Sequence, residues 1–208
     1  MTTPRLWYSL VLLAIASVLA VMPAGAAESC PCQHLKCLFQ LLKQRNALAV
    51  GYDKIAQLPD LAIKDDSGKA VDFIDMDQLT QAQRQAKLDE INSKKATYEK
   101  AENNLYEEVP AAPDCGKAVS ATAKTNPVTC LIDNNALKAA QKALPCKELG
   151  ALIAAHEKYH FMQCVMRKHP DNTLPYIWLT PAGVAKEEAE AYRREAKTIS
   201  KLIDSCCG

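Results

Sequence analysis

The stretch that decides the fold is residues 147–168, which read KELGALIAAHEKYHFMQCVMRK. Its apolar and histidine positions recur at steps of three and four residues, which is the period of an α-helix with one buried face. These positions are Leu149, Leu152, Ile153, His156, His160 and Cys164. The pattern predicts a helix that places both histidines on its buried side, one turn apart and pointing inward together.

Glu157 lies between the two histidines in the sequence His156-Glu157-Lys158-Tyr159-His160. Histidines one helical turn apart can each present a ring nitrogen to one zinc ion, and the glutamate is placed to take a proton from zinc-bound water. The alternative is a pair of core histidines capped by neighbouring polar groups. We favour zinc, because two buried histidines beside a buried glutamate are costly without a metal or a dense hydrogen-bond network.

A catalytic zinc site usually has three protein ligands and one open position, so a third ligand is needed. Gln163 and Met166 stand where the metzincin pattern requires glycine and histidine, which excludes that continuation. A final helix is predicted from about Ala182 to Cys206, and Glu188 interrupts its apolar inner stripe near the start. We therefore predict Glu188 as the third ligand.

The two glutamates that flank this ligand have a different expected role. Glu187 and Glu190 lie roughly 100° and 200° around the helix from Glu188. We expect both to face solvent or the flank of the helix, as ordinary surface charges.

These residues resemble the gluzincin group of zinc peptidases, in which an HExxH helix is joined by a glutamate from a following antiparallel helix. The matching residues are His156, Glu157 and His160, followed by Glu188-Ala189-Glu190-Ala191-Tyr192. The resemblance covers about residues 146–207. It implies a zincin-like helical catalytic region with Zn²⁺ as cofactor and a peptide or protein as substrate.

In this hypothesis Glu157 acts as general base and a nearby donor stabilises the developing oxyanion. Tyr192, His169 and Tyr176 are the candidate donors. Tyr192 lies one turn beyond Glu188 and is the residue assigned here, with a core tyrosine as the alternative. His169 precedes Pro170 at a helix end, where an ordinary surface histidine is the competing interpretation.

The amino-terminal residues 1–26 have the order of a secretory signal peptide. Arg5 precedes an apolar run from Leu10 to Met22, and small residues follow it. The run is shorter than the ~20 residues of a spanning helix, so we expect cleavage and no stable membrane insertion. The rest of the chain has as many basic as acidic residues, which gives no support for nucleic-acid binding. We expect a soluble exported protein, periplasmic or secreted.

The chain has nine cysteines, all of them after the predicted signal peptide. An exported chain with so many cysteines indicates a disulfide framework, and the odd count leaves at least one outside an intramolecular pair. We expect Cys164 to pair with Cys130 or Cys115, and Cys146 to lie near Cys206 or Cys207. The full set comprises Cys30, Cys32, Cys37, Cys115, Cys130, Cys146, Cys164, Cys206 and Cys207.

Helix-forming composition predicts one long helix over residues 35–57, ended by Leu58-Pro59-Asp60, and a second helical stretch over residues 77–107. We expect these two to form an antiparallel hairpin. Between residues 109 and 146 we expect an irregular connector, a short extended segment at Val128–Ile132 and a short helix at Asn135–Leu144.

The sequence thus predicts a mainly α protein, disulfide-stapled, with few or no short strands. It comprises a signal peptide (1–26), a long helical hairpin (27–108) and a small metallopeptidase region (109–208). The predicted function is that of an exported zinc-dependent metallopeptidase. Two alternatives stay open: a non-catalytic, disulfide-stapled helical binding protein, and a secreted effector or toxin that uses the same chemistry.

Overall fold

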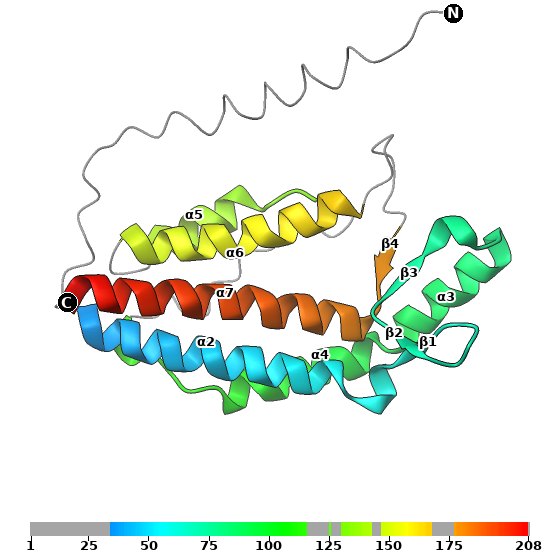
Figure 1. Cartoon of the computed structure of the whole chain (residues 1–208), viewed down its shortest axis with the longest axis horizontal. Helices are drawn as coiled ribbons and strands as arrows, with labels where there is room; N and C mark the ends of the chain where they lie inside the picture. Colours follow the sequence, from blue (N-terminus) through cyan, green and yellow to red (C-terminus); the bar gives the residue numbers. More distant parts are fainter. Residues whose placement is uncertain (1–33, 116–124, 126–129, 143–146, 168–176, 208) are drawn as a thin grey trace, which may run out of the picture.

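A computed structural model describes residues 34–115, 125, 130–142, 147–167 and 177–207. Most of them are helical, and the long helices lie side by side (Figure 1). In chain order the elements are α2 (Leu35–Ala56), β1 (Ile63–Lys64), β2 (Ala70–Val71), β3 (Phe73–Asp75), α3 (Gln81–Ser93), α4 (Lys95–Glu108), α5 (Asn134–Lys142), α6 (Lys147–Met166), β4 (Ile177–Leu179) and α7 (Pro181–Cys207).

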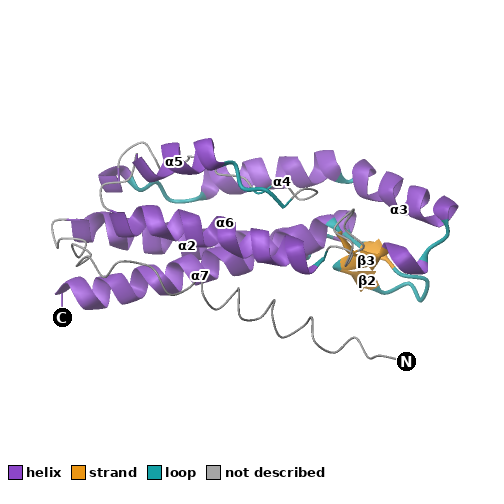
Figure 2. Cartoon of the chain, turned by 90° about the horizontal axis from the view of Figure 1, so that it is seen from above, coloured by secondary structure: helices purple, strands orange, loops and turns teal. Residues whose placement is uncertain are grey.

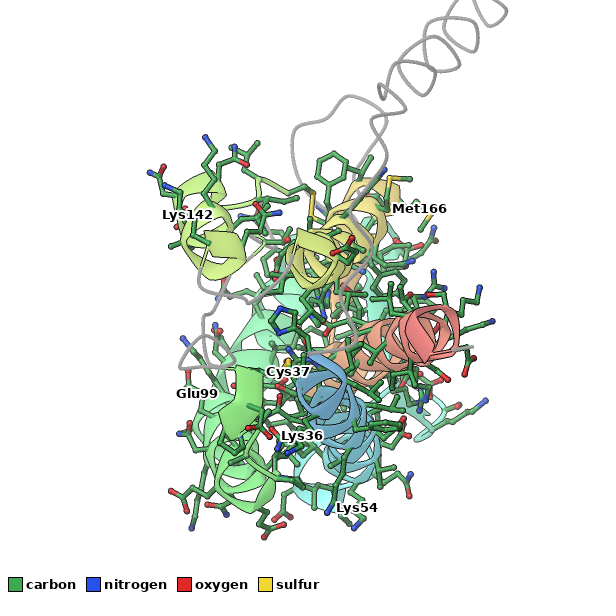
Figure 3. All side chains as sticks on the ribbon, turned by 90° about the vertical axis from the view of Figure 1, so that its left-hand side faces the viewer. Lys36, Cys37, Lys54, Glu99, Lys142 and Met166 are labelled. Atoms are coloured by element: carbon green, nitrogen blue, oxygen red, sulfur yellow. A yellow bond between two sulfur atoms is a disulfide. The ribbon has the colours of Figure 1, made fainter. Side chains whose placement is uncertain are left out.

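Helices α2, α6 and α7 form the centre of the molecule. Figure 1 shows α7 running antiparallel to both α2 and α6, and in the view along the bundle side chains fill the space between the three helices (Figure 3). One buried apolar cluster joins them, because Leu38 and Leu41 of α2 pack with Leu149 and Leu152 of α6 and with Ile199 of α7. The central prediction, a buried helix followed by an antiparallel final helix, is confirmed.

A second apolar cluster joins the other end of α2 to α4 and α7. Leu48, Tyr52 and Ile55 of α2 pack with Leu105 of α4. The α7 contribution consists of small side chains, Ala185 and Ala189. Both apolar clusters cross the boundary predicted near residue 109, and the division of the chain into regions stays a prediction.

The stretch predicted as one helix over residues 77–107 forms two helices, so that prediction is wrong in detail. Helix α3 starts at a capping box, in which Thr80 and Gln83 satisfy each other's backbone N–H groups. The chain then breaks at Lys94, whose Nζ donates to the carbonyl oxygen of Asp60 at 2.9 Å. The break lets the two helices pack on different partners, α3 on the small sheets and α4 on α2 (Figure 2).

Two small antiparallel sheets lie at one end of the bundle. Strands β1 and β2 form a hairpin whose turn includes Gly68 at φ +84°, in the left-handed region that favours glycine. Strand β3 pairs with β4, with Ile74 opposite Trp178. This second pairing joins segments more than a hundred residues apart, so local sequence patterns do not reveal it.

The β3–β4 sheet also anchors the start of α7. The Thr180 N–H donates to the carbonyl oxygen of Asp72, and its hydroxyl accepts from the Gly183 N–H at 3.1 Å, as a helix N-cap does. Gly183 packs directly on the Asp72 backbone, where a Cβ would overlap the carbonyl oxygen. The close approach fixes where α7 begins and thereby where its glutamates lie.

Two disulfides join described residues, Cys37–Cys115 and Cys130–Cys164. The second confirms one of the two pairings expected for Cys164, and both fit the oxidising environment of an exported protein. The expected neighbourhood of Cys146 with the final cysteines lies outside the described residues and side chains. None of the described helices is long and apolar enough to cross a membrane.

The glycine contact at the start of α7 gives a test of the fold. Gly183→Ala should lower the free energy of unfolding by about 1–3 kcal/mol, because the new methyl group meets backbone that cannot give way. Gly150→Ala in α6 is the matched control, since its Cβ would meet only Gln141 atoms, Cβ, Cγ and Cα, at ordinary van der Waals distances. That control should be neutral or stabilising by up to about 1 kcal/mol. Equal effects of the two substitutions in urea unfolding would contradict the described packing.

Candidate metal centre

Helices α6 and α7 bring together three side chains that could hold a metal ion. His156 and His160 come from successive turns of α6, and Glu188 comes from the facing part of α7. Their ligand atoms all lie within 4.8 Å of one another. The structure therefore places the three predicted ligands in one cluster, as the sequence pattern proposed.

The separations within the cluster are close to those of ligands on one small ion, with Glu188 the least well placed. The His156 and His160 Nε2 atoms are 3.0 Å apart, and Glu188 oxygens lie 3.5 Å from the first and 3.3 Å from the second. Two ligands held at ~2.0–2.1 Å by a tetrahedral zinc ion are roughly 3.3 Å apart. The two Glu188 distances are to different oxygens, so the carboxylate would have to turn for one oxygen to share an ion with both nitrogens.

The far side of His156 is held by a buried carboxylate. Its Nδ1 lies 2.5 Å from Glu195 Oε1, and the other Glu195 oxygen lies 2.6 Å from Arg45 Nε of helix α2. So short a contact between an imidazole nitrogen and a carboxylate oxygen needs a proton, which we place on Nδ1 of His156, although the N–H does not aim at the oxygen. The lone pair of Nε2 is then free to face the cluster.

His160 has the same kind of support from different residues. Its Nδ1 lies 2.9 Å from Glu187 Oε1, and Arg167 Nη1 donates to the second oxygen of Glu187. The side chain of Glu187 is only 11% exposed, so the expectation that it is a solvated surface charge is wrong. Glu187 does lie on the flank of α7, where His160 and Arg167 contact it in place of solvent.

Two neutral histidines in this arrangement would place two nitrogen lone pairs against each other. If both histidines are neutral with the proton on Nδ1, the side that lies against a glutamate, the two Nε2 atoms face each other at 3.0 Å with lone pairs that would repel. A proton or a cation between them removes this repulsion. The geometry is therefore compatible with either a shared proton or a bound metal ion.

The neighbouring carboxylates raise the pKa values of both histidines, which favours positive charge on them. Burial alone would lower the pKa of each histidine, but hydrogen bonds to Glu188 and Glu195 raise that of His156 to about 9. Hydrogen bonds to Glu187 and Glu188 raise the pKa of His160 to about 10. Burial would raise the pKa of Glu188, yet the two histidines lower it to about 2. Without a metal, positive charge stays on the histidines at neutral pH.

Glu157, the predicted general base, is buried on the flank of α6 beside the histidines. One of its oxygens accepts a hydrogen bond from Thr125 Oγ1 at 2.8 Å, and the same hydroxyl approaches the Glu157 carbonyl oxygen at 3.2 Å. Thr125 pairs with Ile132 in an isolated β-bridge. Part of the extended segment predicted at Val128–Ile132 lies outside the described residues.

Tyr192, the predicted oxyanion donor, packs its ring against His156 at a centroid distance of 4.8 Å. Its hydroxyl lies 3.4 Å from that of Tyr106, which lies 3.0 Å from that of Tyr52. Tyr52 in turn donates to Glu102 at 2.7 Å. Since a carboxylate only accepts, the chain runs from Tyr192 towards Glu102, and the Tyr192 proton points to Tyr106.

Burial, together with the neighbouring hydroxyls and carboxylates, raises the pKa of Tyr192 well above its ordinary value, so it stays protonated. The other two candidate donors, His169 and Tyr176, lie outside the described residues.

Sequence reasoning missed four residues of this centre: Arg45, Thr125, Arg167 and Glu195. Glu195 and Arg45 each occupy a position on an otherwise apolar helix stripe, which was a usable sign of a buried charge. Arg167 follows His160 by seven residues, directly after the end of α6, and so continues the side of the helix that carries His160. Thr125 gave no such sign.

Comparisons of the chain with protein-family models, with curated proteins and with solved structures found no match.

The pKa shifts predict how the stability of the metal-free protein depends on pH. Histidines with raised pKa values contribute stability that is complete below their ordinary value of 6.5 and lost as pH rises through about 9 to 10. Glu188 contributes stability above its ordinary value of 4.5 that is lost as pH falls towards about 2. The melting temperature of chelator-treated protein should therefore fall on both sides of this range.

Glu188→Gln provides the comparison, because it removes one carboxylate that favours the charged histidines. The alkaline fall in melting temperature should begin at lower pH in this variant. A melting temperature that is level from pH 7 to 10 in the wild type would contradict the described cluster.

Proposed function

We propose that this protein is an exported zinc-dependent metallopeptidase, of the gluzincin type, that acts in the periplasm or outside the cell. The observation that supports it most is the facing pair of His156 and His160 Nε2 atoms, closed by Glu188. Each histidine is backed by its own carboxylate, as metal-binding histidines usually are. Glu157 follows the first ligand directly, where the chemistry needs a base.

The donor set favours zinc over harder cations. Two imidazole nitrogens and one carboxylate suit zinc, whereas magnesium and calcium take oxygen ligands. Glu188 is 25% exposed while the histidines are mostly buried, so solvent and substrate would reach the centre from the Glu188 side. Three protein ligands with one accessible side describe a catalytic site better than a closed structural one.

A zinc ion held by His156, His160 and Glu188 would supply Lewis acidity, which lowers the pKa of a coordinated water towards ~7 and polarises a peptide carbonyl. Glu157 would accept the proton of that water and later deliver it to the leaving amine. Thr125 engages one Glu157 oxygen and leaves the other for this transfer. The hydrogen bond also fixes the plane of the carboxylate.

Tyr192 is the candidate that donates to the developing oxyanion. Its hydroxyl would first have to turn away from Tyr106. The proton now directed at Tyr106 has to turn towards the substrate, which breaks the first link of the hydroxyl chain. At 3.4 Å that link is long for an O–H···O bond, so little is lost by breaking it. Tyr192 therefore donates only when substrate competes with Tyr106.

Zinc content and peptidase activity together test the proposal on the mature, oxidised protein. Wild type and Glu157→Gln should each bind one equivalent of zinc, because Glu157 is not a ligand. Glu188→Ala should lose it. Activity on a mixed peptide library should fall by roughly 10²–10⁴-fold in Glu157→Gln, the usual contribution of a general base.

The same measurements separate the proposal from its rivals. Folded wild-type protein that binds no added zinc would favour the helical binding protein. One bound zinc with no cleavage of any peptide, in wild type as in Glu157→Gln, would indicate a structural ion. An effector or toxin would share the zinc and the loss of activity in Glu157→Gln, and would differ only in its substrate.

A further inference from the structure

We propose that Arg45 of the amino-terminal helix α2 is a positioning residue of the metal centre, acting on His156 through Glu195. The proposal rests on the metal-binding function argued above and deepens it. In this proposal the amino-terminal half of the chain contributes Arg45 of α2, and the carboxy-terminal half contributes the ligands.

The contacts form a continuous line from α2 to the ligand. Arg45 Nε lies 2.6 Å from Glu195 Oε2, and Glu195 Oε1 lies 2.5 Å from His156 Nδ1. The side chains are 12% exposed for Arg45 and 6% for Glu195. Each oxygen of the carboxylate is in short ion-pair contact with one neighbour, and neither N–H is aligned as in a hydrogen bond, so charge and close packing link Arg45 to His156.

Arg45 is itself held in place by packing. It lies on the apolar stripe of α2, between Leu41 and Leu48, which are both buried. Its guanidinium lies over the Tyr192 ring, 5.4 Å from the centroid, and Nη1 donates to Gln44 Oε1 at 3.3 Å. A charge is costly at such a position, and Glu195 offsets that cost only in this arrangement.

The arginine has a chemical effect on the ligand. A buried glutamate with no cation beside it would compete strongly for the imidazole proton, whereas a paired one accepts a hydrogen bond and leaves the proton on Nδ1. His156 then keeps Nε2 as its ligand atom, with the ring turned towards His160 and Glu188. The pair also cancels the negative charge of Glu195, so that charge does not weaken a bound metal as a Lewis acid.

The second histidine provides an independent example of the same arrangement. Glu187 and Arg167 hold His160 with the same order of contacts, imidazole to carboxylate to guanidinium. Arg167 comes from the region that follows α6, whereas Arg45 comes from the opposite half of the chain. The repetition of the arrangement indicates that the arginines serve the ligands and not helix docking alone.

The chain offers a matched control for helix docking. Arg193 of α7 pairs with Asp53 of α2, so it joins the same two helices as Arg45 and Glu195 do. This pair lies on the surface, with side chains 46% and 38% exposed, and touches none of the ligands. Arg193→Met therefore removes an α2–α7 ion pair without disturbing the metal centre, and should change little.

The experiment measures zinc affinity by chelator competition, and the histidine ring signals by long-range ¹H–¹⁵N NMR, on the full mature chain. Arg45→Met should raise the zinc Kd by roughly 10–100-fold, the usual effect of losing support behind a ligand. It should also shift the Nδ1–H signal of His156 while that of His160 stays in place. Arg45→Lys should restore part of the affinity, since a cation again faces Glu195.

If Arg45→Met does not fold, the double variant Arg45→Met/Glu195→Gln replaces it. It leaves no unpaired buried charge, and the amide oxygen introduced by Glu195→Gln can still accept from Nδ1 of His156. Its zinc affinity should lie between those of the wild type and Arg45→Met/Glu195→Leu, which also leaves no unpaired charge but lacks the acceptor. An affinity equal to that of Arg45→Met/Glu195→Leu would overturn the proposal.

Two other outcomes overturn it as well. One is an unchanged zinc Kd and an unchanged His156 signal in folded Arg45→Met, and the other is an equal loss in Arg193→Met. Wild-type protein that binds no zinc would instead refute the proposed function. The His156 ring signal in metal-free Arg45→Met would still report whether Arg45 holds the ring, so the two failures are distinguishable.

Discussion

Charge neutralisation between buried side chains is the constraint on which this structure depends. Helices α2, α6 and α7 enclose two histidines, a glutamate at position 195 and an arginine at position 45, none of which could be buried alone. Each is stabilised because a partner of opposite or complementary charge comes from another helix. The register of the three helices is therefore fixed by polar contacts as well as by the apolar clusters around them.

The sequence was most informative where a pattern was local. The spacing of His156 and His160 predicted an inward-facing pair, and the interruption of an apolar stripe by Glu188 predicted a third member of the cluster. Long helices over residues 35–56 and 181–207 were predictable from composition for the same reason. These features depend on helical periodicity, which is visible in one stretch of chain.

Contacts between distant segments were not predictable in this way. Glu187 was assigned to solvent because a helical wheel does not show which neighbouring helix lies on its flank. Arg45 and Glu195 both occupied apolar stripes, but nothing in the pattern of either helix showed that they face each other across α2 and α7. The pairing of β3 with β4 and the break at Lys94 were missed for the same reason. Each depends on a distant part of the chain, β4 in the first case and Asp60 in the second.

The Cys130–Cys164 disulfide limits how far Thr125, the hydrogen-bond partner of Glu157, can move from α6. Cys164 lies one turn after His160 on α6, so the bridge attaches residue 130 to the helix that carries the histidines. Thr125 is five residues from that attachment, which allows it to move at most ~17 Å from residue 130 even in a fully extended chain. A hydroxyl on so short a tether has a high effective concentration beside Glu157, whichever path the intervening residues take.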